Sequence, residues 1–263
     1  MKPTPHTTPE AQPPPLAALS AYLDQLLSHD TVSDWPQARN GLQVENNGTV
    51  TKLGAAVDAC ETTLRMALEA GVDLLLVHHG LFWSGVQPVT GATYRKLKLA
   101  IEGNLALYSS HLPLDLHAEF GNNAGLAQAI GLPVPAPFFM EKGSAIGLRS
   151  EWTIDRETLR ERLAQAVGGP VKLIPGGPQT TTHVGLVTGG AGGDLFKAAQ
   201  EGVDTFITGE GPHWSYTAAE EQGINLLYAG HYATETFGVK ALAAHLSERY
   251  RLPWVFLDHP TGL

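Results

Sequence analysis

Three features that would assign a protein to a particular class are scarce in this sequence. Its 263 residues include one cysteine, Cys60, so no disulfide can form within the chain, which suits a reducing compartment. Its 17 basic residues form no cluster and are outnumbered by 26 acidic ones, whereas a phosphate backbone attracts clustered positive charge. The longest uninterrupted apolar runs, such as 74–77, are far shorter than the roughly 20 residues of a membrane helix. No charged-then-apolar secretory leader is visible. We therefore expect a cytoplasmic protein that neither crosses a membrane nor binds nucleic acid.

Apolar residues are plentiful enough for a sizeable core. Hydrophobic residues make up 43% of the chain and charged residues 16%, which fits one large or two small globular domains. Residues 1–15 differ from the rest, because they hold six prolines and little apolar material. We expect a disordered tail there, with order beginning at Leu16, where apolar residues recur at helical spacing.

Short apolar segments alternate with amphipathic ones over the remaining chain. Strands are predicted at 54–57, 74–77, 105–108, 171–174, 184–187, 205–207, 226–228 and 255–257, and helices at 61–70, 156–167, 194–201 and 239–248. The strands are apolar on both sides, so their sheets should be covered on both faces. This pattern predicts an α/β fold.

Two blocks of the first half recur in the second. Residues 64–83 match 195–214 at an offset of 131 with seven identical positions, and residues 103–115 match 223–235 at an offset of 120. Chance similarity explains one such block better than two in the same order. We predict two similar α/β domains from an internal duplication, 16–135 and 136–263. The last strand, 255–257, could pair with either, and interleaved halves stay open.

The second block carries a histidine followed four residues later by an acid in each copy. The pairs are His111 with Asp115 and His231 with Glu235. Residues four apart share one face of a helix, and 231–246 has the composition of a good helix. Pro113 keeps the first pair out of the middle of a helix. A capping ion pair is the alternative explanation for either pair taken alone.

A third group of candidate ligands is the His78-His79 pair, which directly follows the apolar strand 74–77. Ligands of open α/β sheets gather at the carboxyl ends of strands. Imidazoles combined with carboxylates suit Zn, Fe, Mn, Co or Ni. The donors His78, His79, His111, Asp115, His231 and Glu235 suffice for two divalent transition-metal ions. The alternative for the His pair alone is two hydrogen-bonded residues at a strand end.

The repeat is asymmetric at this pair, because His78-His79 aligns with Gly209-Glu210. If the two domains face each other across a cleft, Glu210 and His213 are candidates to orient the ligands or to face a substrate. The alternative is that both are solvated loop residues.

Several motifs resemble those of one protein family. They are NGLQV (40–44), VHHGLFW (77–83), YSSHLPLD (108–115), TGEGPHW (208–214) and YAGHYATE (228–235). They are similar to motifs of the Nif-three-like (NGG-interacting-factor-like) proteins, whose bacterial members are often labelled GTP cyclohydrolase 1 type 2. The resemblance runs from about Leu16 to Leu257.

The resemblance implies two similar α/β domains, a dinuclear metal site in the cleft between them, and a ring-shaped homohexamer. The metal ligands of the family carry over to His78, His79, Asp115, His231 and Glu235, and His111 matches a further histidine of the family. The sequence departs from the family at Gly80, where proline is common. It also lacks the second histidine that often accompanies His213, so no substrate role carries over to that residue.

Two functions fit these residues. One is a dinuclear metal-dependent hydrolase acting on a small molecule such as a nucleotide, and the family label points to opening of the GTP ring with release of formate. The other is a non-catalytic metal-binding or regulatory interaction protein. The cleft motifs contain no Lys or Arg that could bind a triphosphate. Open coordination positions on the metal ions would favour the enzyme over the non-catalytic protein.

Overall fold

Strands and helices alternate along the chain, as the sequence predicts. The computed structural model describes residues 13–85 and 87–263. Its helices are α1 (Leu16–Leu26), α2 (Glu61–Glu69), α3 (Gly91–Glu102), α4 (Leu112–Asp115), α5 (Asn122–Ile130), α6 (Arg156–Val167), the 3-10 helix η1 (Ala191–Asp194), α7 (Leu195–Gln200), α8 (Ser215–Gln222), α9 (His231–Thr234) and α10 (Thr236–Tyr250). Its strands are β1 (Gly41–Val44), β2 (Leu53–Asp58), β3 (Leu74–His79), β4 (Ala106–Ser109), β5 (Ala136–Glu141), β6 (Ser144–Asp155), β7 (Lys172–Pro175), β8 (Thr180–Leu186), β9 (Thr205–Thr208), β10 (Asn225–Tyr228) and β11 (Trp254–Phe256). Every predicted strand overlaps one of these.

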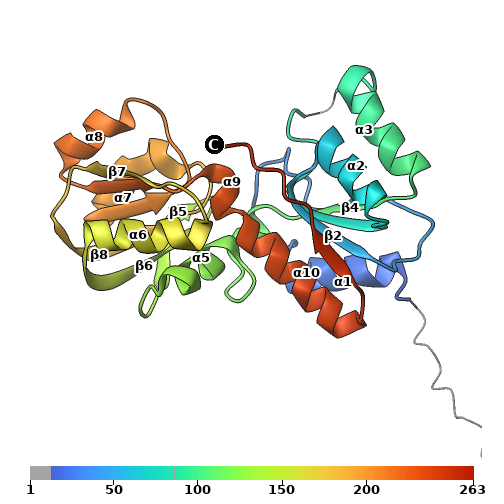
Figure 1. Ribbon diagram of the computed structural model, residues 1–263, viewed down its shortest axis with the longest axis horizontal. Helices are drawn as coiled ribbons and strands as arrows, with labels where there is room; N and C mark the ends of the chain where they lie inside the picture. The colour runs from blue at the N-terminus through green and yellow to red at the C-terminus, as the bar shows by residue number, and fades with distance from the viewer. Residues whose placement is uncertain (1–12, 86) are drawn as a thin grey trace, which may run out of the picture.

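The strands form two sheets, one in each of two lobes (Figure 1). The first sheet has the order β1-β4-β3-β2-β11 and the second the order β5-β6-β8-β9-β10-β7. The core strands β2, β3 and β4 are parallel, as are β8, β9 and β10. The predicted α/β class with two similar halves is confirmed.

The duplication extends to almost every element. The order α1-β1-β2-α2-β3-α3-β4-α4-α5 is repeated as α6-β7-β8-α7-β9-α8-β10-α9-α10. In each repeat, the strand that precedes the three parallel strands in sequence pairs antiparallel with the last of them. Strand β1 pairs with β4, and β7 pairs with β10. Leu53 pairs with Leu74, and Val184 with Thr205, so paired residues of the first two parallel strands are 21 positions apart in both halves.

Each sheet lies between two pairs of helices, as apolar strands require. In β3 the side chains alternate: Leu74 and Leu76 belong to the core formed with α1 and α10, and Leu75 and Val77 to the core formed with α2 and α3. In the second lobe, α5 and α6 cover one face and α7 and α8 the other.

The last helix of each repeat packs on the opposite lobe. Helix α5 belongs to the first repeat but inserts Leu126 and Ile130 among the second-lobe residues Leu159 and Leu186. Helix α10 belongs to the second repeat but covers β2 and β3, and Figure 1 shows it beside α1. The two repeats therefore exchange their terminal helices.

Strand β11 follows α10 into the first lobe, where it pairs in parallel with β2. This settles which partner the last strand takes, which the sequence left open. The boundary between 16–135 and 136–263 stays a prediction, although the exchange shows that these segments are not separate lobes. Of the predicted tail, residues 1–12 lie outside the described residues, and Pro15 forms a β-bridge with Thr49. Within the described part of the chain, every helix is too short or too polar to span a bilayer.

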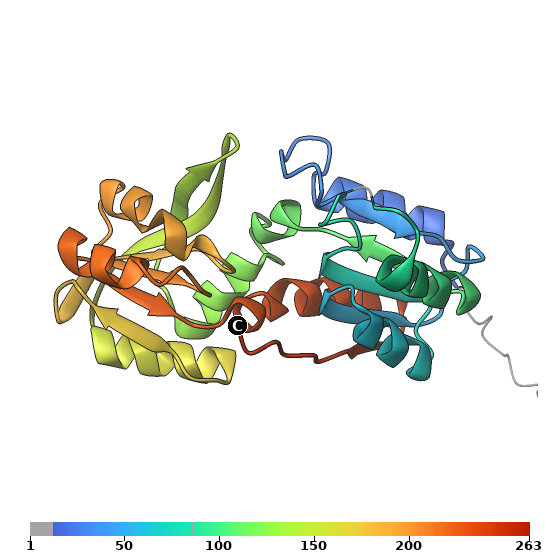
Figure 2. The ribbon, with the colours of Figure 1, turned by 90° about the horizontal axis from the view of Figure 1, so that it is seen from above.

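The hairpin β5–β6 has no counterpart in the first repeat and was not predicted. It rises from the second lobe toward the loop before β1 (Figure 2). At its tip the Lys142 ammonium lies 4.5 Å from the centre of the Trp35 ring of the first lobe. The hairpin thus reaches across one side of the space between the lobes.

Candidate metal centre

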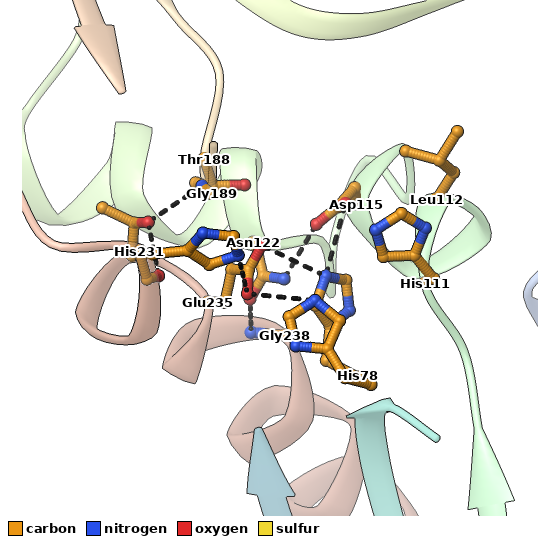
Figure 3. Close-up of polar contacts among 12 residues, drawn as sticks. His78, His111, Leu112, Asp115, Asn122, Thr188, Gly189, His231, Glu235 and Gly238 are labelled. Carbon is orange, nitrogen blue, oxygen red and sulfur yellow. Dashed lines mark hydrogen bonds and ion pairs between the residues drawn. The ribbon is translucent and has the colours of Figure 1, made fainter. Parts of the chain in front are cut away.

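A cavity of about 880 Å³ lies between the two lobes and is lined by both. The first lobe contributes the ends of β2 and β3 and the start of α4, and the second contributes the segment after β8 and helix α9. The carboxyl ends of the parallel strands of both sheets meet there, where open α/β sheets place their ligands. Figure 3 shows side chains from both lobes pointing toward one centre.

His78 and His79 end β3, and both rings turn toward this centre, with their centroids 4.7 Å apart. The His78 ring is completely buried, and its Nδ1 lies 3.0 Å from the carbonyl oxygen of Ser110. The Nδ1 of His79 lies 2.9 Å from Oδ1 of Asp58, the last residue of the neighbouring strand β2. One ring nitrogen of each histidine is therefore anchored.

His111 precedes α4, and two residues of the loop before β1 hold it in place. Its Nδ1 lies 2.9 Å from Oδ1 of Asp34, and its backbone N–H donates to Oδ1 of Asn40 at 2.8 Å. The Asn40 amide in turn donates to Asp34 at 2.9 Å. The His111 ring centroid lies 4.9 Å from that of His78, and Pro113 occupies the first turn of α4, where proline is tolerated.

The continuous helix predicted for 231–246 is interrupted. Helix α9 ends at Thr234 and α10 starts at Thr236, because the Glu235 backbone between them leaves helical values at φ −102° and ψ 5°. This break redirects the chain, so that α10 crosses to the first lobe. The spacing still brings Nε2 of His231 to 3.2 Å from Oε2 of Glu235, while Nδ1 of His231 lies 2.8 Å from Oε1 of Glu210.

Glu235 lies at the centre of the cluster. Its Oε1 is 3.5 Å from Nε2 of His78, and its Oε2 is 3.5 Å from Nε2 of His79 and 3.2 Å from Nε2 of His231. The side chain is 4% exposed. One carboxylate therefore faces three imidazoles from both lobes.

Asp115 contacts fewer groups. Its Oδ2 lies 3.5 Å from Nε2 of His78, and its Oδ1 accepts a hydrogen bond from the Asn122 amide at 2.8 Å. The Asn122 oxygen accepts from the backbone N–H of Gly238 at 2.6 Å. This chain of contacts ties the start of α5 to α10 behind the cluster.

One pattern is common to the four histidines: Nδ1 faces an oxygen that can only accept a hydrogen bond from it. The acceptors are the Ser110 carbonyl and the carboxylates of Asp58, Asp34 and Glu210. Each Nδ1 must then carry the proton, which leaves Nε2 available to the cavity. Oxygen acceptors of this kind orient imidazole ligands in metal sites.

The distances across the cluster fit a metal ion. Two atoms bound to one ion at about 2.1 Å and tetrahedral angles are about 3.4 Å apart, close to the 3.2–3.5 Å separations observed here. Nε2 of His78 and Oε2 of Glu235 are buried without a hydrogen-bond partner among the described residues. The ligand atoms form two compact groups, His78–His79–His111 and His79–His231–Glu235.

The electrostatics of the cluster favour positive charge. Burial lowers the pKa of His78, but the carboxylates of Asp115 and Glu235 outweigh burial and raise that pKa to about 10. Burial also lowers the pKa of His231, and its bonds to Glu235 and Glu210 raise it to about 9. Burial raises the pKa of Glu235, yet the nearby imidazoles hold it well below its ordinary value. A cation bound at Nε2 would replace a proton there.

The structure thus brings together all five residues that the resemblance assigns as ligands, together with His111. Glu210 joins them through its bond to His231. His213 is exposed and is not among the described residues that line the cavity. The roles of these residues stay predictions.

Sequence reasoning missed the groups that anchor the histidines. Asp34, Asn40 and Asp58 are distant in sequence from the rings that they orient. Asp58 had a usable signal, because it ends a predicted apolar strand next to the strand that ends in His79. Asn40 is the first residue of the NGLQV motif and Asp34 lies six residues before it, but neither follows a periodic pattern.

Gly189 is a further residue that the site requires. Its φ is +72°, and a Cβ at this position would collide with Oε1 of Glu235. The missing side chain leaves the space that the Glu235 carboxylate occupies. Glycine also suits the left-handed backbone there.

Comparison with known proteins places these residues in a family. The family model described as Duf34/NIF3 (NGG1p interacting factor 3) matches residues 15–261. A protein of Deinococcus radiodurans named GTP cyclohydrolase 1 type 2 homolog is 42% identical over 228 residues, which are 85% of this chain and 86% of that one. A protein of Halobacterium salinarum with the same name is 41% identical over 251 residues, covering 93% and 97%.

Solved structures show the same fold. The protein TTHA1606 from Thermus thermophilus is 46% identical and superposes with a TM-score of 0.87, covering 95% of this chain and all of that one. HcgD from Methanocaldococcus jannaschii, solved in its reduced form, is 26% identical with a TM-score of 0.84 and the same coverage.

Proposed function

The chain belongs to the Duf34/NIF3 family, and from this membership and the geometry of the cavity we propose that it is a dinuclear metal-dependent hydrolase. The observation that carries the proposal is the shared orientation of four histidines. In each, Nδ1 is anchored by an oxygen, and Glu235 meets Nε2 of three of them. This arrangement supports metal binding more than a structural ion-pair network, in which a buried Nε2 such as that of His78 would have a hydrogen-bond partner, whereas here its carboxylates stay 3.5 Å away.

The contacts suggest how the ligands would divide between two ions. His78, Asp115 and Glu235 would hold one ion, and His79, His231 and Glu235 would hold the other. Imidazole and carboxylate donors suit Zn, Fe, Mn, Co or Ni. Elemental analysis of protein purified without chelators should find about two such ions per chain, and absence of metal after reconstitution would contradict the proposal.

Two adjacent divalent ions would lower the pKa of water and polarise the bond that is broken. The chain itself would handle protons through His111, which lines the cavity and is held by Asp34. A histidine in this position can accept a proton from water and deliver it to a leaving group. The His111→Ala variant should therefore lose activity, and its metal content separates the two roles of His111, because loss of metal would identify it as a ligand in the group His78–His79–His111.

The name of the relatives suggests a candidate reaction, the opening of the GTP ring with release of formate. Metal-loaded protein should be tested on GTP, other nucleotides, phosphodiesters and short peptides, with formate measured for GTP. Hydrolysis of any of these that is lost in His78→Ala and His231→Ala would support the enzyme. If fully loaded protein hydrolyses none of them and its ions have no open position, the non-catalytic metal-binding or regulatory function replaces it.

The resemblance to the family also supports a homohexameric ring, and the composition supports a cytoplasmic location. Sedimentation velocity of the purified protein would test the first proposal. A mass near that of one chain would contradict it.

A further inference from the structure

The charge of the cavity bears on which substrate the proposed hydrolase takes. Among the described residues that line the cavity, five carry carboxylates and none is Lys or Arg. The carboxylates are those of Asp58, Asp115, Glu141, Asp194 and Glu235. Two nearby lysines are already engaged. The Lys197 ammonium lies 3.2 Å from Glu141 and 4.3 Å from the centre of the Phe139 ring, and the Lys142 ammonium lies 4.5 Å from the centre of the Trp35 ring.

Two divalent ions would offset four of the five carboxylates, and Lys197 pairs with the fifth. Lys142 beside Trp35 adds one positive charge, and the carboxylates of Asp34 and Glu210, which contact His111 and His231, add two negative ones. The loaded cavity would then carry no surplus of positive charge. Proteins that bind phosphate chains supply Arg, Lys or several backbone N–H groups beyond the metal. A triphosphate could place one phosphate on an ion, but the others would face carboxylates such as Asp194, which is exposed.

The apolar part of the cavity wall includes the indole rings of Trp35 and Trp83. Trp83 stands nearly perpendicular to the rings of His79 and His111, with centroids 5.5 Å and 4.7 Å away. Trp35 lies 6.0 Å from His111 on another side and is 39% exposed. Indole rings bind flat heterocycles by stacking, and this contact needs no charge on the ligand.

We infer that the cavity takes an uncharged or cationic aromatic heterocycle of nucleobase or nucleoside size, in preference to a phosphorylated nucleotide. This inference rests on the proposed function for the reaction, but binding can be measured without turnover. The cavity volume of about 880 Å³ is ample for a nucleoside.

The experiment compares guanosine with GTP on metal-loaded protein by isothermal titration calorimetry, at low and high salt. Chromatography checks that each ligand stays intact, and elemental analysis after each titration detects metal removed by the nucleotide. We expect guanosine to bind at least as tightly as GTP, and GTP binding not to weaken as salt rises. GTP binding at least tenfold tighter than guanosine, and weakened by salt, would overturn the inference. Failure of guanosine to bind would also overturn it.

A matched pair of variants tests the aromatic wall. Trp83→Leu should weaken guanosine binding about tenfold or more, as the loss of a stacking partner does. Trp214→Leu should leave it unchanged, because Trp214 is the counterpart of Trp83 in the second repeat but lies outside the described cavity lining and is 46% exposed. Equal effects would contradict the inference. Guanosine binding without hydrolysis of any substrate would instead remove the proposed function and leave this inference standing.

Discussion

The two repeats share a backbone but differ at the few positions that face the cavity. In the first repeat, Asp58 ends β2 and orients His79, which ends β3. At the same pair of positions, 21 residues apart, the second repeat has Gly189 and Glu210. Glu210 orients His231 instead, and Gly189 leaves space for Glu235. The orienting carboxylate thus occupies the first of the two positions in the first repeat, as Asp58, and the second position in the second repeat, as Glu210.

This difference shows how a symmetric framework can hold one asymmetric site. Both repeats deliver strand ends to the same cavity, but only the first presents a histidine pair there. The counterparts Asp115 and Glu235 also differ in the number of histidines that they contact. Asp115 lies near Nε2 of one histidine, and Glu235 lies near Nε2 of three. The repeat alone would predict equal roles for these two acids.

The largest expected effect separates these two acids. Glu235→Gln should reduce metal affinity by more than about 100-fold, since it removes the charge shared by three imidazoles, whereas Asp115→Asn should reduce it less. Competition with a fluorescent chelator measures both, and far-UV circular dichroism confirms folding. Equal losses would show that the symmetry of the repeat extends to the site.

The next effect concerns the two orienting carboxylates. Asp58→Asn and Glu210→Gln should each lower metal affinity by about 10–100-fold, the loss typical of groups that hold a ligand in place. The same chelator competition applies, with the exposed Glu221→Gln as the control that should change nothing. A loss in Glu210→Gln as large as that in Glu235→Gln would contradict the indirect role of Glu210.

A smaller effect tests the space at Gly189. Gly189→Ala and Gly223→Ala should each cost about 1–2 kcal/mol of unfolding free energy, because their φ values are +72° and +67°. A Cβ at Gly223 meets nothing within 4 Å, whereas one at Gly189 meets Glu235. Only Gly189→Ala should therefore also lose metal affinity. Denaturant unfolding and metal titration of both variants check this, and unchanged metal binding in Gly189→Ala would contradict it.

The smallest expected difference is in the stability lost on substituting Asp73 or Asp204, because these equivalent residues make the same contacts in the two repeats. Asp73 accepts from the backbone and hydroxyl of Thr51 at 2.8 and 2.5 Å, and Asp204 from those of Thr182 at 2.8 and 2.7 Å. Each Asp→Asn change should cost about 1–2 kcal/mol of unfolding free energy and leave metal affinity unchanged. Urea unfolding measures the two costs, and a clear inequality would show that the shared contacts are not equivalent.

The sequence carried the central features of the fold because they are local or repeated. Strand β3 is a run of apolar residues that ends in two histidines, and helix α6 has the bounds predicted from its pattern, 156–167. The matching blocks predicted the duplication. The four-residue spacing predicted that Glu235 would meet His231, whereas Asp115 meets His78 and the carboxylate that contacts His111 is that of Asp34.

The missed features depend on contacts that are distant in sequence. The sequence predicted a helix at 239–248, within α10, but not α5, and it did not predict that each of these helices packs on the other lobe. The break at Glu235 accompanies the packing of α10 on the first sheet, a contact that no local pattern marks. Asp34 orients His111 across 77 residues, and no local pattern marks such a pair.

The exchange of α5 and α10 between lobes ties the two repeats together. Separating the repeats would pull Leu242 and Leu246 of α10 out of the first core, and exposing each buried leucine costs about 1.5–3 kcal/mol. The lobes therefore act as one cooperative folding unit, and neither repeat has a complete core of its own.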